Sequence, residues 1–362
     1  MSRRYKKNLF IFSSFCYHYH VLNFNLYMLS KGEEMNRDLG INLCRVTEAA
    51  ALGSARFLGQ GNKNGADQIA VEEMRHMFNY LGIHGKVVIG EGEIDEAPML
   101  YIGEQIGDPN DPEQVDIAVD PIDGTTSLAD GMQNSISVIA VAPKGLMLNA
   151  PDVYMKKIAV GPKAKGKIDI RKSVRENIEA VAQALEKSIS EITVSVLKRE
   201  RHNKLIKEIR ETGARISMVT DGDILTAIAT ALDKGKIDIV MGTGGAPEGV
   251  IAACALKCLG GDFQGIFAPS DSEQVQRCLK MNVEFDKVYT IDDLVQGNNV
   301  LFAATGITDG TFLHGVEFKK ENVATTQSLL LRLPSGTIRY IDSEHKLLQK
   351  AEARLLQMEE DD

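Results

Sequence analysis

Two carboxylates and a hydroxyl group follow an apolar segment near residue 120. Asp120, Asp123 and Thr125 lie in the sequence Asp-Pro-Ile-Asp-Gly-Thr, directly after residues 115–119, whose apolar run indicates a buried strand. Two carboxylates held close together repel each other unless a cation lies between them, and hard divalent cations prefer oxygen ligands. The pattern indicates a metal site, although Pro, Asp, Gly and Thr also form ordinary turns and helix caps.

A second acidic segment follows another strand. Residues 90–96 place four carboxylates in seven positions, directly after the strand-like residues 86–89. A solvated acidic loop explains most of these carboxylates. Glu91 differs from the others because it leaves its strand as Asp120 does, and because two glycines flank it and allow close backbone approach. Glu91 is therefore the best candidate in this segment for a metal ligand.

Two helix starts carry further candidates. Residues 61–67 bring the ammonium group of Lys63 and the carboxylate of Asp67 to the mouth of a helix, where a helix cap is the simpler interpretation. Glycines in residues 242–249 precede an apolar helix, whose N-terminus presents backbone N–H groups to an anion. The segment lacks the third glycine of a dinucleotide motif and the lysine of a phosphate loop. Glu248 within it is either a residue favoured by the helix dipole or a metal ligand.

Two polar clusters follow strands in the second half of the chain. Residues 198–202 form a compact basic cluster that suits a phosphate and equally suits a solvated surface. Asp221-Gly222-Asp223 follows the strand-like residues 215–219 and offers acceptors for sugar hydroxyls, although a simple turn also explains it. Ligands of α/β folds bind at loops that follow the carboxyl ends of strands, so these loops are candidates for the binding site.

The body of the chain alternates between helical and strand-like spacing of apolar residues. From Met35 onward there is no internal repeat or long linker, which predicts one mixed α/β domain. The predicted helices cover residues 41–57, 66–81, 174–185, 202–212, 250–259 and 344–358. The predicted strands cover residues 86–89, 115–119, 135–141, 193–197, 215–219, 236–241 and 299–305.

Composition excludes several classes of protein. The 362 residues are 44% hydrophobic and 25% charged, unlike a disordered or collagen-like chain. The net charge of −9 disfavours nucleic acid as a partner, because it repels a phosphate backbone. No apolar run approaches the roughly 20 residues that span a bilayer, so no membrane partner is expected. The five cysteines are scattered without C-x-x-C spacing, which indicates reduced thiols in a cytoplasmic protein.

The first 34 residues differ in composition from the rest. They hold eight of the 21 aromatic residues and carry a charge of +3, from five basic and two acidic side chains. A signal peptide begins in a similar way, but the apolar run is short and no small-residue cleavage site follows. Lys31-Gly32-Glu33-Glu34 can be encoded by a purine run like that of a bacterial ribosome-binding site. We therefore expect translation to begin at Met35, with residues 1–34 a spurious or disordered extension.

Taken together, these segments resemble the class II fructose-1,6-bisphosphatases, within the lithium-sensitive sugar and inositol phosphatase superfamily. The resemblance rests on Arg45-Val46-Thr47-Glu48, residues 89–100, Asn149-Ala150-Pro151-Asp152 and residues 244–249, and it extends through Asp293. It implies a layered α/β/α/β/α sugar-phosphatase fold in one domain, residues 35–362. Within that domain, it implies a metal-binding part at roughly 35–165, a substrate-binding part at roughly 166–340 and a C-terminal helix.

The resemblance also implies roles for individual residues. Five carboxylates would bind metal, and Thr125 would position the attacking water, so that Thr125, Asp120 and Glu91 are the implied catalytic residues. The implied metal ligands are Asp67, Glu91, Asp120, Asp123 and Glu248. The implied substrate contacts are Lys63, Asp123, Gly124, Thr125, Tyr154, Arg199, Glu200, Arg201, Asp221, Gly222, Asp223 and Gly245.

Two positions depart from the pattern of the class. The class usually has glutamate where Asp123 stands, and the shorter side chain resembles the inositol monophosphatase and class I branches. The Lys-Pro-Arg of the family is replaced by Arg199-Glu200-Arg201, which adds a carboxylate beside the implied phosphate contacts. These departures concern metal spacing and phosphate contacts.

The implied activity is hydrolysis of the 1-phosphate of fructose 1,6-bisphosphate, which yields fructose 6-phosphate and phosphate in gluconeogenesis. The all-oxygen ligands favour two or more Mn²⁺ or Mg²⁺ ions as cofactors. Because phosphoryl transfer needs positioning and charge neutralisation more than covalent chemistry, we expect direct hydrolysis without a phosphoenzyme. A sedoheptulose-1,7-bisphosphatase or an inositol-phosphate phosphatase is an alternative, and a non-catalytic metal- or nucleotide-binding regulatory protein is a remote one. The oligomers of the family suggest a homodimer or homotetramer.

Overall fold

The computed structural model describes residues 35–92, 99–233 and 236–349. The chain separates into two compact units, Met1–Asn36 and Arg37–Asp362, and every helix and strand given below belongs to the second unit. The predicted extension of residues 1–34 lies outside the described residues, so the expectation that translation begins at Met35 stays a prediction.

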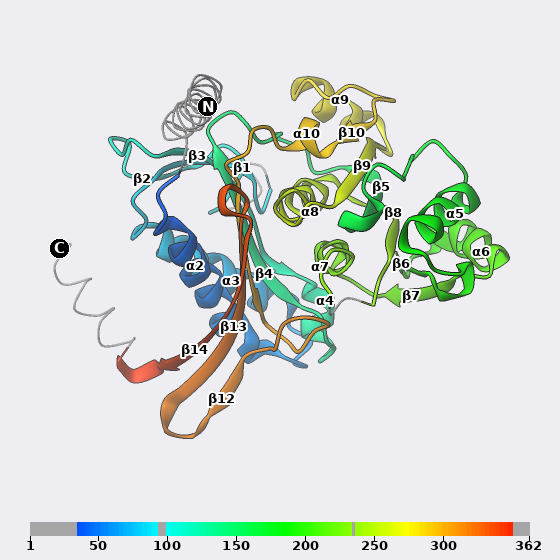
Figure 1. The fold of residues 1–362 in the computed structure, drawn as a ribbon. Helices are drawn as coiled ribbons and strands as arrows, with labels where there is room; N and C mark the ends of the chain where they lie inside the picture. Colours follow the sequence, from blue (N-terminus) through cyan, green and yellow to red (C-terminus); the bar gives the residue numbers. More distant parts are fainter. Residues whose placement is uncertain (1–34, 93–98, 234–235, 350–362) are drawn as a thin grey trace, which may run out of the picture. The chain divides into compact units, whose positions relative to one another are not determined.

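Two mixed sheets form the framework of Arg37–Asp362 (Figure 1). The first sheet has the order β12-β13-β11-β4-β3-β1-β2, with β14 paired to β13, and β1 and β3 run parallel within it. Its strands are β1 (His84–Ile89), β2 (Gln105–Gly107), β3 (Gln114–Asp123), β4 (Ile136–Pro143), β11 (Leu301–Gly306), β12 (Glu317–Lys319), β13 (Val323–Arg332) and β14 (Thr337–Lys346).

The second sheet has the order β10-β9-β5-β8-β6-β7. Its strands are β5 (Tyr154–Val160), β6 (Thr193–Leu197), β7 (Arg215–Val219), β8 (Ile239–Gly245), β9 (Asp262–Phe267) and β10 (Tyr289–Thr290). The strands β8, β6 and β7 run parallel to one another, whereas β5 lies antiparallel to both β8 and β9. Because β5 already belongs to this sheet and β11 to β14 return to the first, the two sheets do not divide the chain near residue 165.

Helices cover and separate the two sheets. On one side of the first sheet lie α2 (Leu39–Ser54) and α3 (Lys63–Phe78), and on the far side of the second lie α5 (Val174–Leu185) and α6 (Asn203–Thr212). Between the sheets lie α7 (Asp223–Ala229) and α8 (Ala246–Leu259), as Figure 1 shows. The predicted α/β/α/β/α layering is therefore confirmed. The short helices α4 (Thr125–Ala129), α9 (Ser272–Lys280) and α10 (Ile291–Leu294) complete the set of described α-helices.

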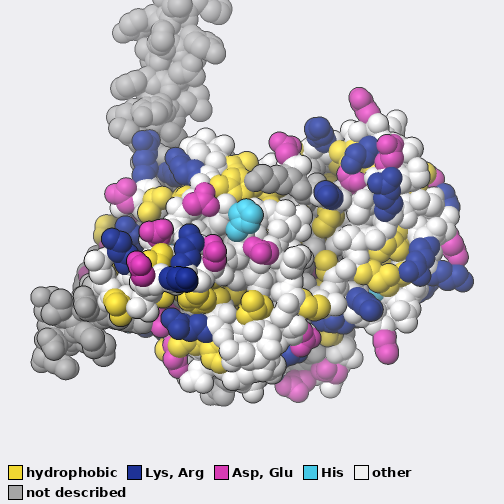
Figure 2. All heavy atoms as spheres, turned by 90° about the horizontal axis from the view of Figure 1, so that it is seen from below, with side chains coloured by type: hydrophobic (Ala, Val, Ile, Leu, Met, Phe, Trp, Pro, Cys, Tyr) yellow, Lys and Arg dark blue, Asp and Glu magenta, His cyan; other side chains and the backbone are white. Residues whose placement is uncertain are grey.

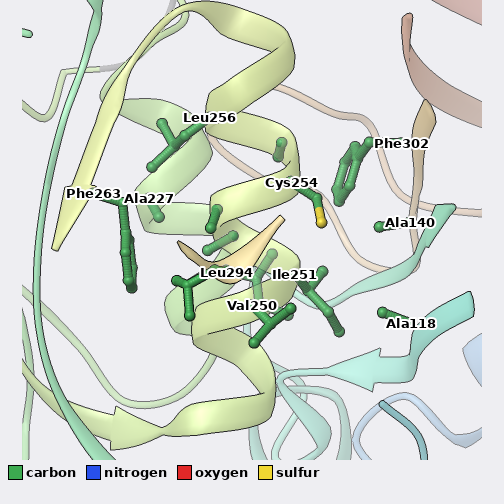
Figure 3. Packing of buried hydrophobic residues seen from close by; sticks show 14 of the residues in the cluster. Ala118, Ala140, Ala227, Val250, Ile251, Cys254, Leu256, Phe263, Leu294 and Phe302 are labelled. Carbon is green, nitrogen blue, oxygen red and sulfur yellow. The ribbon is translucent and has the colours of Figure 1, made fainter. Parts of the chain in front are cut away.

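The central helix α8 is apolar on all sides because it packs between two sheets. In Figure 3 Ile251 and Cys254 lie toward Ala118, Ala140 and Phe302, which belong to the first sheet. Phe263 of the second sheet lies on the other side of the helix (Figure 3). Cys254 is fully buried and unoxidised, and the described cysteines are all free thiols, as the sequence predicts.

Several sequence-predicted elements need correction. The helix predicted from residue 344 is wrong at its start, because β14 continues through Lys346 and pairs with β13 along its whole length; residues 350–358 lie outside the described part. The strand predicted for residues 115–119 extends to Asp123. The other predicted helices and strands are confirmed, and the bounds of α5, β6 and β7 agree to the residue.

On the face drawn in Figure 2, Lys and Arg side chains are interspersed with Asp and Glu and do not gather into one basic patch. None of the helices in the described ranges combines the length and the apolar character that a bilayer-spanning segment needs.

Candidate active site

The parallel strands β1 and β3 bring three carboxylates to one edge of the first sheet. Glu91 follows β1, and Asp120 and Asp123 lie in the last residues of β3. The β3–β4 register shifts by one residue between Asp120 and Asp123, and the Asp120 Oδ1 atom accepts a hydrogen bond from the Ile122 N–H at 3.0 Å. Such a bulge re-aims the side chains that follow it. The predicted turn is therefore present, but it is a bulge within the strand.

Thr125 joins this edge to α3. Gly124 precedes α4 with a φ of 101°, in the left-handed region that favours glycine, and so turns the chain abruptly after Asp123. The Thr125 hydroxyl lies within donating distance of Asp67 Oδ1 at 2.9 Å and of the Ile122 carbonyl at 3.1 Å. The side chain of Asn62 caps α3, which leaves Asp67 free of the capping role that the sequence allowed.

The predicted metal ligands lie close enough to perturb one another. Burial, followed by the charges of Asp123, Glu91 and Glu248, raises the pKa of Asp120 well above its usual range. Burial also raises the pKa of Asp123, to which Asp223 and Glu248 add their repulsion. Burial raises the pKa of Asp67, although its bond from Thr125 opposes the shift.

The two glutamates show the same crowding. Glu91 is exposed as a residue, but the protein atoms around its carboxyl group, followed by the charges of Asp67 and Glu248, raise its pKa to about 7. Burial raises the pKa of Glu248 to about 6, with Lys157 opposing and Asp223 adding to the shift. Like charges that raise one another's pKa in this way are stabilised by a cation placed among them.

The residues fit a hard divalent cation, although they are not assembled around one. Over residues 35–92, 99–233 and 236–349, no three His, Cys, Asp or Glu side chains are arranged to hold a metal ion. Glu248 Oε2 is nevertheless buried with no hydrogen-bond partner, and an unsatisfied buried carboxylate oxygen is costly. The five carboxylates offer only oxygen donors, which Mg²⁺ and Mn²⁺ prefer. The predicted ligand set is brought to one region and stays a prediction.

The predicted substrate contacts of the second sheet lie beside the carboxylates. Asp221 Oδ2 accepts a hydrogen bond from the Thr126 N–H at 3.0 Å, and Lys63 donates to the Thr126 hydroxyl at 2.9 Å. A Cβ on Gly222 would lie 3.4 Å from Asp123 Oδ2, so this loop packs directly against the end of β3. The Asp221–Asp223 loop therefore connects the two sheets at the site.

The basic cluster is held by backbone carbonyl groups. Arg199 donates to the Thr220 carbonyl at 2.6 Å and pairs with Asp221 at 3.5 Å. Arg201 donates twice to the Thr243 carbonyl, at 3.0 and 2.8 Å, and its guanidinium lies 4.6 Å from the centre of the Tyr154 ring. These contacts place Arg199 toward the loop 221–223 and Arg201 toward Tyr154. Glu200 between them is exposed.

Lys157 is not among the site residues predicted from the sequence, and His202 is predicted only as a member of the basic cluster 198–202. Lys157 is 8% exposed and binds Asp223 and the Gly245 carbonyl. His202 is buried, accepts the Thr243 N–H at Nε2 over 2.8 Å, and lies 2.7 Å from the Leu197 carbonyl through Nδ1. Because Nε2 accepts, Nδ1 carries the proton, and burial lowers the pKa of His202. A lysine inside an apolar strand was the available signal for Lys157.

The chain is similar to known proteins over most of its length. The family described as bacterial fructose-1,6-bisphosphatase, glpX-encoded, matches residues 37–345. A relative from Acaryochloris marina, named D-fructose 1,6-bisphosphatase class 2/sedoheptulose 1,7-bisphosphatase 2, is 45% identical over 90% of this chain and 100% of its own length. Fructose-1,6-bisphosphatase 1 class 2 of Escherichia coli K12 is 46% identical over 87% of this chain and 97% of its own.

Proposed function

Because the chain belongs to the glpX-encoded bacterial fructose-1,6-bisphosphatase family, we propose that it hydrolyses the 1-phosphate of fructose 1,6-bisphosphate. The products are fructose 6-phosphate and inorganic phosphate, as in gluconeogenesis. The observation that carries the proposal is the group of carboxylates with raised pKa values at the ends of two parallel strands, beside Thr125, whose hydroxyl bonds to a further carboxylate, Asp67. Such a group suits cations that bind a phosphate.

Each side of the site has a separate task in this proposal. Asp67, Glu91, Asp120, Asp123 and Glu248 hold two or more Mg²⁺ or Mn²⁺ ions, which supply charge neutralisation at the phosphate and activation of water. The Thr125 hydroxyl, fixed by Asp67 and the Ile122 carbonyl, orients the attacking water. Direct hydrolysis then needs positioning and charge neutralisation more than covalent chemistry.

The second sheet binds the rest of the sugar bisphosphate. Asp221 and Asp223 accept hydrogen bonds from sugar hydroxyls, and Arg199 and Arg201 face the phosphate that is not cleaved. Arg201 supports this role, because its two hydrogen bonds to the Thr243 carbonyl and its contact with the Tyr154 ring hold it in one orientation. Lys63, Gly124 and Gly245 complete the contacts at the helix starts.

Sedoheptulose 1,7-bisphosphate is the second candidate substrate. The Acaryochloris marina relative carries both activities in its name and is 45% identical to this chain over its whole length. The two substrates differ by one carbon, so one site with metal ions at one end and arginines at the other accommodates both.

Phosphate release tests the proposal. Purified protein is assayed with fructose 1,6-bisphosphate, sedoheptulose 1,7-bisphosphate and inositol 1-phosphate, each with Mg²⁺, Mn²⁺ or a chelator. We expect metal-dependent release from fructose 1,6-bisphosphate, abolished by the chelator. Activity on inositol 1-phosphate alone, or release that the chelator leaves unchanged, would contradict the assignment.

We further propose that the enzyme acts in the cytoplasm as a homodimer or homotetramer. The free thiols among the described cysteines and the family's sugar phosphate substrates support the compartment. Light scattering of the purified protein measures the oligomeric state, and a monomeric mass would contradict this part.

A further inference from the structure

Lys157 occupies a position in β5 where an apolar side chain is expected. The strand β5 lies between β8 and β9, and alternate residues of a strand share one face. Met155 and Ala159, on either side of Lys157, belong to the apolar core between the two sheets. Lys157 itself is 8% exposed. A lysine in such a place needs charged and hydrogen-bonding partners to offset its loss of hydration.

The partners of Lys157 come from two helix starts. Its Nζ lies 2.5 Å from Asp223 Oδ2, and Asp223 is the first residue of α7. The same Nζ donates to the carbonyl of Gly245 at 2.7 Å, and Gly245 is the residue directly before α8. One ammonium group therefore fixes the starts of α7 and α8 relative to each other.

Glycines make the room that this arrangement needs. A Cβ on Gly244 would collide with Asp223 Oδ2 and lie 3.0 Å from Lys157 Nζ. A Cβ on Gly249 would lie 3.3 Å from Lys157 Cδ. Any larger residue at Gly244 would push the ion pair apart, so the glycine-rich segment before α8 accommodates the lysine.

We propose that Lys157 is a positioning residue for the sugar part of the substrate. It holds Asp223 and the Gly245 backbone in the orientation in which they contact the sugar bisphosphate. The ion pair uses Oδ2 of Asp223, so that Oδ1 serves as the acceptor for a sugar hydroxyl. The inference rests on the proposed function, because it gives Asp223 and Gly245 their role at the same site.

The proposal predicts that Lys157 affects substrate binding more than turnover. In Lys157→Met, which keeps the aliphatic stem, KM for fructose 1,6-bisphosphate rises about tenfold to a hundredfold, as for loss of a charge-assisted hydrogen bond. The value of kcat stays within about threefold of the wild type, because Lys157 positions groups that bind the sugar and not the groups that react. Asp223→Asn gives a similar rise in KM, and the double variant is no worse than either single one.

Lys156 provides the matched control. It is the neighbouring lysine of the same strand, but it is exposed and donates to the Ile170 carbonyl on the opposite face of the sheet. Lys156→Met keeps the KM of the wild type. A Gly244→Ala variant tests the same contact with both charges present, and a raised KM is expected there too, which keeps the test decisive if Lys157→Met does not fold.

Three results would overturn the proposal. One is a lowered kcat with unchanged KM in Lys157→Met. The second is a loss of Mn²⁺ affinity of more than about tenfold by calorimetry, which would place Lys157 on the metal side. The third is equal KM values for Lys157→Met and Lys156→Met. The expected rise in KM corresponds to the free energy that one charge-assisted hydrogen bond typically contributes.

A failure of the proposed function can be distinguished from a failure of the role proposed for Lys157. If the wild type releases no phosphate from sugar bisphosphates, titration with fructose 6-phosphate still decides the role of Lys157. Weaker binding by Lys157→Met than by Lys156→Met supports positioning, and equal binding contradicts it.

Discussion

The two sides of the site balance their charges in different ways. At the edge of the first sheet, burial and the charges of neighbouring carboxylates raise the pKa of Asp120, Asp123 and Glu91. At the edge of the second sheet, Asp223 pairs with Lys157 at 2.5 Å and Asp221 with Arg199 at 3.5 Å. The first side therefore depends on added cations, whereas the second carries its own. We call them the carboxylate side and the paired side.

The two sides differ in the free energy that a bound ligand can release. On the carboxylate side the protein holds repelling groups together, at a cost to the folded state that a bound cation removes. On the paired side each aspartate already has a cationic partner before any ligand arrives, although the charge of Asp223 also acts on Asp123 and Glu248 of the carboxylate side. Removing a charge should therefore stabilise the protein on the carboxylate side and destabilise it on the paired side. It should lower turnover on the first side and weaken substrate binding on the second.

The largest effect is expected from removing a carboxylate at the centre of the first side. Asp120→Ala or Glu91→Ala should lower kcat/KM by roughly a thousandfold or more, since a metal site supplies several kcal/mol to the transition state. The circular dichroism spectrum should stay that of the wild type, because the strand β3 is held by its neighbours β1 and β4. Retained metal-dependent activity in either variant would remove the carboxylate side from the mechanism.

Variants on the two sides should also change the stability of the fold in opposite directions. Asp223→Asn leaves Lys157 buried without its anionic partner and should cost roughly 3 kcal/mol of the free energy of unfolding, the range for broken buried pairs. Asp120→Asn in a chelator removes a repelling charge and should raise Tm. Thermal unfolding of both variants measures the difference. A fall in Tm for both would show that the two sides do not differ in charge balance.

Thr125 tests the carboxylate side without touching its charge. Thr125→Ala loses the hydroxyl that bonds to Asp67 at 2.9 Å and should lower kcat about a hundredfold, as for a misplaced reacting group. Mn²⁺ affinity by calorimetry should change much less. Thr125→Ser keeps the hydroxyl and serves as the control. Equal losses of kcat and Mn²⁺ affinity would give Thr125 only a structural role, through its bonds to Asp67 and the Ile122 carbonyl.

Much of the carboxylate side could be predicted from the sequence. Glu91, Asp120 and Asp123 come directly after apolar runs, and strands of this kind deliver their last side chains to one edge of a sheet. The sequence also predicts Asp67 near a helix start, and the structure adds that Asn62 is the cap and that Thr125 bonds to Asp67. These signals lie within short stretches of sequence, so they can be recognised without knowledge of the fold.

The paired side is harder to predict from the sequence, because its contacts join residues that lie far apart in the chain. Lys157 meets Asp223 across 66 positions of sequence, and two consecutive lysines obscure the alternation of β5. The spacing predicts a helix for residues 344–346, the end of β14, because the pairing of β14 with β13 is not visible in local spacing. Tertiary pairing determines both features, and residue spacing does not encode it.

The pH dependence of stability should expose the carboxylate side in the metal-free protein. The pKa of Glu91 is raised from 4.5 to about 7, so the folded protein holds protons that the unfolded chain releases. The free energy of unfolding should therefore fall as the pH rises from 4.5 to 7. Chemical unfolding in a chelator measures this slope. Glu91→Gln should flatten it, whereas Glu179→Gln, on the exposed surface of α5, should not.

The smallest effect is expected at Asp123, which stands where the class usually has glutamate. Asp123 is 4% exposed, and its Oδ2 accepts a hydrogen bond from the Leu225 N–H at 3.3 Å, so it touches α7 as well as the carboxylate side. Asp123→Glu adds one methylene in a crowded place and should shift the ratio of Mg²⁺- to Mn²⁺-supported activity by less than about tenfold, because Mg²⁺ tolerates altered geometry less well. Kinetics with each metal measure the ratio. An unchanged ratio would mean that Asp123 serves the paired side through Leu225 and does not set the spacing of the metal ions.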